Sequence, residues 1–108
     1  MDSRPCLVLT TCPDENIAHN LALHLLDNQL AACIQIQPGI RSIYMWKGAL
    51  EEACEVQLVI KTIHGRLDAI AVALQQIHPY EIPEYLVIDA QAGSADYRQW
   101  LHSVLEAD

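Results

Sequence analysis

Histidine, tyrosine and glutamate side chains gather in one short stretch, QIHPYEIPEYLVIDA, at residues 76–90. The imidazole of His78 is a good ligand for copper or zinc, and Glu81 and Glu84 could add carboxylate oxygens beside it. The stretch also has a structural interpretation. A residue that precedes a proline leaves helical geometry, so His78 before Pro79 could simply end a helix. The sequence favours this interpretation, because an isolated histidine lacks the ligand count that tight metal binding needs.

The four cysteines are the other side chains with metal chemistry. Their even number would allow two disulfides, but the N-terminus has too short an apolar run for an export signal, so we expect reduced thiols. No C-x-x-C pair is present, which argues against a structural zinc site. Cys33 could be a soft metal ligand on a strand, although a free cysteine is more often a small packed hydrophobe. Cys54 is expected to face Arg41 across a hairpin as an inert thiol, and Cys6 and Cys12 to pack or cap.

Basic side chains suggest a second kind of site. Arg41 and Lys61 could face a cleft between subunits and, with Tyr80 and Glu84, hold a small anionic ligand. A simpler interpretation pairs Lys61 with Glu55 or with a carboxylate of a neighbouring subunit. Both alternatives remain open from the sequence.

Two aromatic residues, Tyr44 and Trp46, fall near the end of a predicted hairpin. A hairpin end is poorly stable alone, and exposed aromatic surface is covered in most proteins by a partner. We therefore expect these two side chains to lie in an oligomer interface rather than to form a platform for ligand stacking.

Catalysis has little support in the sequence. There is no nucleophile elbow, phosphate-binding loop or H-E-x-x-H motif. Glu81 and Glu84 could act as general acid and base, but they adjoin a proline turn with no evident nucleophile. We expect a binding protein rather than an enzyme, with no metal or cofactor required for folding.

The composition of the chain excludes some classes of binding partner. The 108 residues predict a single domain over positions 1–108, and the apolar share of 52% suggests that other copies of the chain cover part of its surface. A net charge of −8 argues against nucleic acid and against anionic lipid. No stretch approaches the roughly 20 apolar residues of a membrane span. The expected compartment is the cytoplasm.

Hydrophobic periodicity predicts the elements that must position these side chains. Pro13 is expected at the first helical position. Pro83 is expected at the head of the last strand. Ser94 is expected to cap the final helix. The expected strands cover residues 6–11, 32–37, 40–46, 54–61 and 84–89, and the expected helices run from Pro13 to about Gln29, from about 65 to 77 and from 95 to about 105.

The two central segments can pair in only one register that keeps their apolar faces together. Lys47-Gly48 reads as a two-residue turn, which sets Trp46 opposite Ala49. One extra residue at Pro38-Gly39 is then needed to keep the isoleucines of residues 34–36 on the core face. The fold predicted is α+β: a ferredoxin-like βαββαβ antiparallel sheet with helices on one face, a long bent hairpin between the second and third strands, and an extra C-terminal helix.

Five segments together resemble the CutA divalent-cation tolerance family. They are CPDE, LAACIQIQPGIRSIYMWKG, EEACEVQLVIKT, HPYEIPEYLVIDA and the late pattern Tyr97-x-x-Trp100-Leu101, and they span about residues 7–102. The resemblance implies a homotrimer of ferredoxin-like subunits, kinship of architecture with the PII signalling proteins, and a role in tolerance of copper or other divalent ions. It also implies that the long hairpin packs against neighbouring subunits, which would supply a partner for Tyr44 and Trp46.

Two positions depart from the family pattern. Some members place a cysteine at the position of Thr10 and a second histidine at that of Ile77. The chain thus retains His78, Cys33 and Glu81 as metal candidates, which implies weak metal binding. The alternative is a PII-like small-molecule sensor or protein-interaction hub whose ligand occupies the cleft between subunits.

Overall fold

A computed structural model describes residues 1–106 of this chain. The fold is α+β, with the element order βαββαβ followed by a C-terminal helix. The sheet order is β2-β3-β1-β4, and all three pairings are antiparallel. This confirms the predicted ferredoxin-like topology, with β2 and β4 as the edge strands. The elements are β1 (Pro5–Cys12), α1 (Glu15–Asp27), β2 (Cys33–Trp46), β3 (Ala49–Ile63), a 3₁₀ turn (His64–Arg66), α2 (Leu67–Ile77), β4 (Leu86–Asp89) and α3 (Ala95–Glu106).

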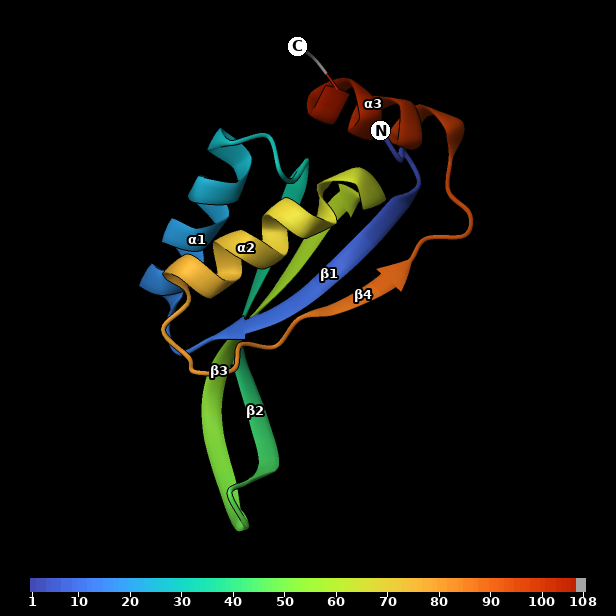
Figure 1. Cartoon of the computed structure of the whole chain (residues 1–108). Helices are drawn as coiled ribbons and strands as arrows, with labels where there is room; N and C mark the ends of the chain where they lie inside the picture. Colours follow the sequence, from blue (N-terminus) through green and yellow to red (C-terminus); the bar gives the residue numbers. More distant parts are fainter. Residues whose placement is uncertain (107–108) are drawn as a thin grey trace.

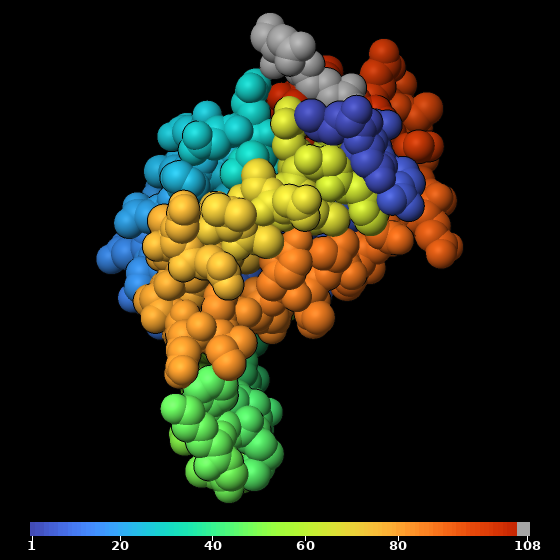
Figure 2. All heavy atoms as spheres, in the orientation of Figure 1, coloured from blue at the N-terminus to red at the C-terminus, as the bar shows by residue number. Residues whose placement is uncertain are grey.

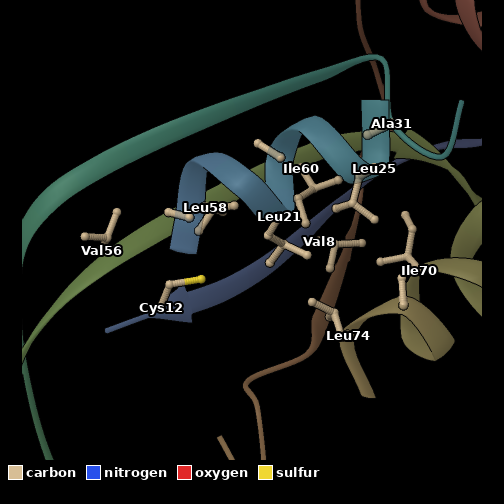
Figure 3. Packing of buried hydrophobic residues seen from close by; sticks show 13 residues of the cluster. Val8, Cys12, Leu21, Leu25, Ala31, Val56, Leu58, Ile60, Ile70 and Leu74 are labelled. Atoms are coloured by element: carbon tan, nitrogen blue, oxygen red, sulfur yellow. The ribbon is translucent and has the colours of Figure 1, made fainter. Parts of the chain in front are cut away.

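The main core lies between the sheet and helices α1 and α2, which cover the same face (Figure 1). Alternate strand residues point into this layer, and the helices contribute side chains at i, i+3 and i+4 spacing. Figure 3 shows Val8, Leu58 and Ile60 of the sheet meeting leucines from both helices. Each buried aliphatic side chain of this kind contributes about 1.5–3 kcal/mol by leaving water.

Helix α3 packs against one end of the opposite face. Its buried Leu101 and Leu105 contact Ile63 of β3, and the His102 Nε2–H donates to the carbonyl of Ser3 at 2.7 Å. The predicted Ser94 cap is confirmed, because its Oγ accepts the N–H of Tyr97 at 3.2 Å. The rest of this face has no helix over it in residues 1–106, and Leu86 and Ile88 of β4 remain 59% and 47% exposed.

The long hairpin has the predicted register. Ile34 faces Ile60, Trp46 faces Ala49, and the ladder shifts between Gln37 and Ile40. Gly39 has a φ of +76° at this bulge. Past the bulge the hairpin leaves the body of the protein, and its green tip stands clear of the helices in Figures 1 and 2.

Several element boundaries differ from prediction. Strand β2 is continuous from Cys33 to Trp46, and β3 begins at Ala49 rather than at Cys54, because pairing continues to the end of the hairpin. Helix α1 begins at Glu15, because the Asp14 side chain caps it by accepting the N–H of Ile17 at 2.9 Å. Pro13 therefore lies outside the helix. A 3₁₀ turn precedes α2. Strand β4 begins only at Leu86, three residues after Pro83, since its pairing with β1 starts at the Leu9–Leu86 pair.

The bulge gives a first testable expectation. Gly39→Ala should lower the free energy of unfolding by about 1 kcal/mol, because a Cβ disfavours positive φ even though no other atom approaches within 4 Å. Urea denaturation at fixed protein concentration measures the change. Gly93→Ala is the matched control, because a Cβ there meets only the Arg98 side chain at 3.6 Å. Equal stability of the Gly39 variant and the wild type would contradict this account of the bulge.

Candidate functional site

A cavity of about 900 Å³ lies between the hairpin and the loop that follows α2. Its walls come from Thr11 at the end of β1, from the hairpin between residues 42 and 55, and from loop residues 79–84. In Figure 2 the orange loop lies directly above the green hairpin. The bend in the hairpin therefore creates the space, and the proline-rich loop closes one side of it.

His78 is a buried structural residue beside this cavity. Its ring Nε2 lies 2.7 Å from the carbonyl oxygen of Thr11, which can only accept, so Nε2 carries the proton. Its Nδ1 accepts the backbone N–H of Tyr80 at 3.1 Å. Its backbone N–H donates to the carbonyl of Leu74 and ends α2. Both ring nitrogens are occupied, so the helix-ending interpretation describes His78, and no lone pair is free for a metal in this arrangement.

Glu55 is the residue that the sequence did not single out for a site. The residue is 7% exposed, and its Oε2 accepts the hydroxyl hydrogen of Tyr80 at 2.7 Å. Burial and the neighbouring Glu55 carboxylate raise the pKa of Tyr80, so its hydroxyl stays a donor. A signal was present: Glu55 alternates with the apolar core positions of β3, which turns it toward the opposite face of the sheet.

Glu84 brings a second carboxyl group to the same wall. Burial, followed by repulsion from Glu55, raises its pKa above the ordinary value. Glu81 lies at the exposed rim of the cavity, where its Oε2 is 3.9 Å from the Lys47 ammonium. Tyr44 and Trp46, expected in a subunit interface, also line the cavity from the hairpin side. Loop and hairpin together therefore assemble carboxylates and aromatic rings around one space.

The predicted metal set does not come together. In the sheet, Cys33 of β2 lies opposite Lys61 of β3, and Lys61 lies opposite Leu7 of β1. His78 contacts β1 at Thr11, which is four residues further along that strand. At about 3.3 Å per residue, this separates Cys33 from His78 by roughly 13 Å along the sheet. Within residues 1–106 no group of three or more His, Cys, Asp or Glu residues could hold a metal ion.

Arg41 and Lys61, which were predicted to face a cleft between subunits, do not line the cavity within this chain. Arg41 pairs with Glu52 on the exposed hairpin. The Lys61 ammonium lies 5.7 Å from the ring centroid of Tyr97 on α3. The suggested Lys61–Glu55 ion pair is wrong, since the two residues are six positions apart on β3, about 20 Å along the strand. Of the four predicted cleft residues, only Tyr80 and Glu84 line the cavity.

Cys6 and Cys12 lack the character of reactive or ligating thiols. Burial raises the pKa of Cys6 and Cys12 to about 11, which keeps both protonated near neutral pH. Cys12 Sγ lies 3.8 Å from His78 Nε2, and Cys54 faces Arg41 in the hairpin, as predicted. All four thiols are free.

These features define the class: a ferredoxin-like α+β protein with a long β2–β3 hairpin and an acidic, aromatic cavity beside it. The chain belongs to the CutA1 divalent ion tolerance protein family, whose model matches residues 6–104. None of the helices described is both long and apolar enough to cross a bilayer.

Relatives match over nearly the full chain. The divalent-cation tolerance protein CutA of Pectobacterium atrosepticum is 42% identical over 97% of this chain and 99% of its own length. The structure of CutA from Synechococcus elongatus is 42% identical, covers 97% and 94% of the two chains, and has a TM-score of 0.90. That of CutA1 from Oryza sativa is 31% identical, covers 99% and 98%, and has a TM-score of 0.93. The family name describes tolerance of divalent ions and designates no reaction.

The raised pKa of Glu84 predicts how stability depends on pH. A carboxyl group whose folded pKa is raised stabilises the fold below its ordinary pKa, and loses that contribution as pH rises through the raised value. Glu84→Gln, which resembles the protonated form, should therefore melt at a higher temperature than wild type at pH 7. The difference should shrink below the ordinary value of 4.5.

Thermal unfolding followed by circular dichroism across this pH range makes the measurement. Glu81→Gln is the control on the same loop, because its side chain is 72% exposed and should change the melting temperature less. A Glu84→Gln protein that melts below wild type at pH 7 would show that the carboxylate is stabilised at this position.

Proposed function

We propose that this chain serves in divalent-cation tolerance by binding divalent ions, copper among them, weakly at the wall formed by Glu55 and Glu84. The observation that carries the proposal is the Glu55 carboxylate, buried against the cavity with a neutral hydroxyl as its hydrogen-bond donor. A buried carboxylate without an opposite charge is costly, and a cation in the cavity would offset that cost. Weak affinity follows because two carboxylates give few ligands, and oxygen donors suit copper less well than imidazole or thiolate.

A homotrimer is part of this proposal. Its support is apolar surface without cover in residues 1–106: Leu86 and Ile88 on the open sheet face, and Ile43, Met45 and Leu50 at the hairpin tip, which are 63%, 65% and 71% exposed. Patches of this kind usually mark contact with another chain. The edge strands β2 and β4 also carry backbone groups that another chain can pair with.

A PII-like small-molecule sensor is the second candidate function. The cavity volume of about 900 Å³ favours it, because small-molecule sites commonly measure about 300–1,000 Å³. A non-enzymatic role agrees with the raised thiol pKa values of Cys6 and Cys12, which leave these residues poor nucleophiles. The cytoplasm is the compartment we propose, since four free thiols suit a reducing environment. A similar structure from Archaeoglobus fulgidus, 27% identical, is described as a periplasmic protein.

Equilibrium dialysis with Cu²⁺ tests the metal site. Glu84→Gln should weaken binding about tenfold, because it removes one charged ligand. His78→Gln should leave the affinity unchanged, since both of its ring nitrogens are already bonded within the protein. Circular dichroism checks that each variant is folded. Loss of copper in the His78 variant, with full retention in the Glu84 variant, would move the site to His78.

Multi-angle light scattering tests the assembly. The wild type should have the mass of three chains at micromolar concentration, and Trp46→Ala should shift it toward monomer by removing apolar contact at the tip. Val72→Ala is the control, because Val72 is also apolar and 54% exposed but lies on α2, away from the open sheet face. A monomeric wild type would refute the trimer.

A further inference from the structure

The β2–β3 hairpin leaves the sheet at a point where the backbone ladder is interrupted on both sides of β3. The pairing of β3 with β1 ends at Val56. The pairing with β2 shifts between Gln37 and Ile40, and Gly39 there has a φ of +76°. Within the described residues, the outer hairpin (residues 40–55) pairs only with itself, and it stands clear of the helices in Figure 1. These features describe a hinge between the sheet and the outer hairpin.

One side-chain hydrogen bond joins the outer hairpin to another element of the described chain. The Tyr80 hydroxyl donates to Oε2 of Glu55 at 2.7 Å. Glu55 follows Val56 toward the tip, just past the end of the β1 ladder, and it lies opposite Ile40, the first paired residue of β2 after the bulge. The bond therefore holds the hairpin at its base, where a small displacement becomes a large movement of the tip.

Tyr80 is itself fixed to the body of the protein. Its N–H donates to Nδ1 of His78 at 3.1 Å, and the centroids of the two rings are 4.7 Å apart. His78 is buried, and its Nε2–H donates to the carbonyl of Thr11 on β1 at 2.7 Å. Because Tyr80 is anchored to β1 in this way, its bond to Glu55 can restrain the hairpin.

The surroundings of this bond give the hairpin little other support. The cavity of about 900 Å³ lies between hairpin and loop, so the two lack the close packing that immobilises a core. Glu55 and Glu84 line it from opposite sides of the hinge, and burial, followed by repulsion from Glu55, raises the pKa of Glu84. At the rim, Lys47 and Glu81 are 3.9 Å apart and both 72% exposed, so their attraction is weak.

We propose that the Tyr80–Glu55 hydrogen bond is a latch on a hinged hairpin. While the bond is made, the hairpin keeps one angle to the sheet; once it is broken, the hairpin turns about the bulge, driven by repulsion between Glu55 and Glu84. The latch shares these two glutamates with the wall proposed for metal binding, but it requires neither a ligand nor a second chain. It gives the exposed tip one defined position, which a surface for assembly requires.

Time-resolved fluorescence anisotropy of Trp46 tests the latch. The parent chain carries Trp100→Phe, so that Trp46 is its single tryptophan, and EDTA removes metal ions. Trp46 of the parent should rotate with the whole molecule. Tyr80→Phe keeps the ring and removes the hydroxyl, so it should shift the equilibrium toward the open hairpin about tenfold. The shift is measured as a larger amplitude of fast depolarisation.

Two further variants make the result specific. Tyr85→Phe is the matched control, because its hydroxyl donates to the carbonyl of Leu67 at 3.2 Å, away from the hairpin, and should leave the decay unchanged. Glu84→Gln added to Tyr80→Phe should reduce the fast amplitude again, because it removes the repulsion across the cavity. A general packing defect caused by Tyr80→Phe would not be corrected by this second change.

The outcomes separate the latch from the proposed function. Equal decays of the parent and of Tyr80→Phe overturn the latch, and no recovery on adding Glu84→Gln overturns repulsion as the opening force. Light scattering of the same samples gives their mass. A monomeric parent whose Trp46 is released by Tyr80→Phe removes the proposed trimer and supports the latch. A trimer whose Trp46 is insensitive to Tyr80→Phe leaves the trimer standing and removes the latch.

Discussion

The register shift between Gln37 and Ile40 is the constraint on which the rest of the structure depends. Strand residues alternate between faces, so without the shift the isoleucines of β2 would meet the wrong side of β3. Pro38 has no N–H to give to a ladder, and Gly39 accepts a positive φ, so both residues fit the point where pairing is interrupted. The shift keeps Ile34 and Ile36 with the core and lets the remaining hairpin bend away from the body. That bend makes the space that becomes the cavity.

The local sequence pattern was sufficient to predict the strands, turns and caps of the fold, but it was insufficient to predict the contacts of the candidate site. The bulge, the Lys47-Gly48 turn and the Ser94 cap depend on neighbours in sequence or on strict alternation, and all three were predictable. The bonds of His78 to Thr11 and of Tyr80 to Glu55 join residues that are 67 and 25 positions apart. Nothing in the local sequence fixes such pairs. The sequence therefore favoured His78 as the end of a helix without indicating its bond to Thr11, and it left Lys61 as an open alternative partner for Glu55. The start of α1 was placed too early, because Pro13 suits a first helical position, whereas in the structure the Asp14 side chain caps the helix and Glu15 is its first residue.

A short series of hydrogen bonds between buried polar groups connects the end of β1 to the cavity wall. The carbonyl of Thr11 accepts from His78, His78 accepts from the N–H of Tyr80, and the Tyr80 hydroxyl donates to Glu55. Each neutral member has a partner, as burial requires. The charged member at the end, Glu55, has only one neutral donor in the described residues. The chain of bonds therefore ends at a carboxylate in the cavity wall.

The hairpin tip belongs to the cavity and to the surface proposed for assembly. Tyr44 and Trp46 line the cavity and are also 42% and 36% exposed. Because one set of side chains serves both, contacts that order the tip in an oligomer would also fix the aromatic wall for a ligand. Linkage then requires the reverse: a cation held between the hairpin and loop residues 79–84 must favour the assembled state by the same free energy. Assembly and cation binding in this chain are in that case thermodynamically coupled, and the position of the bulged hairpin determines both.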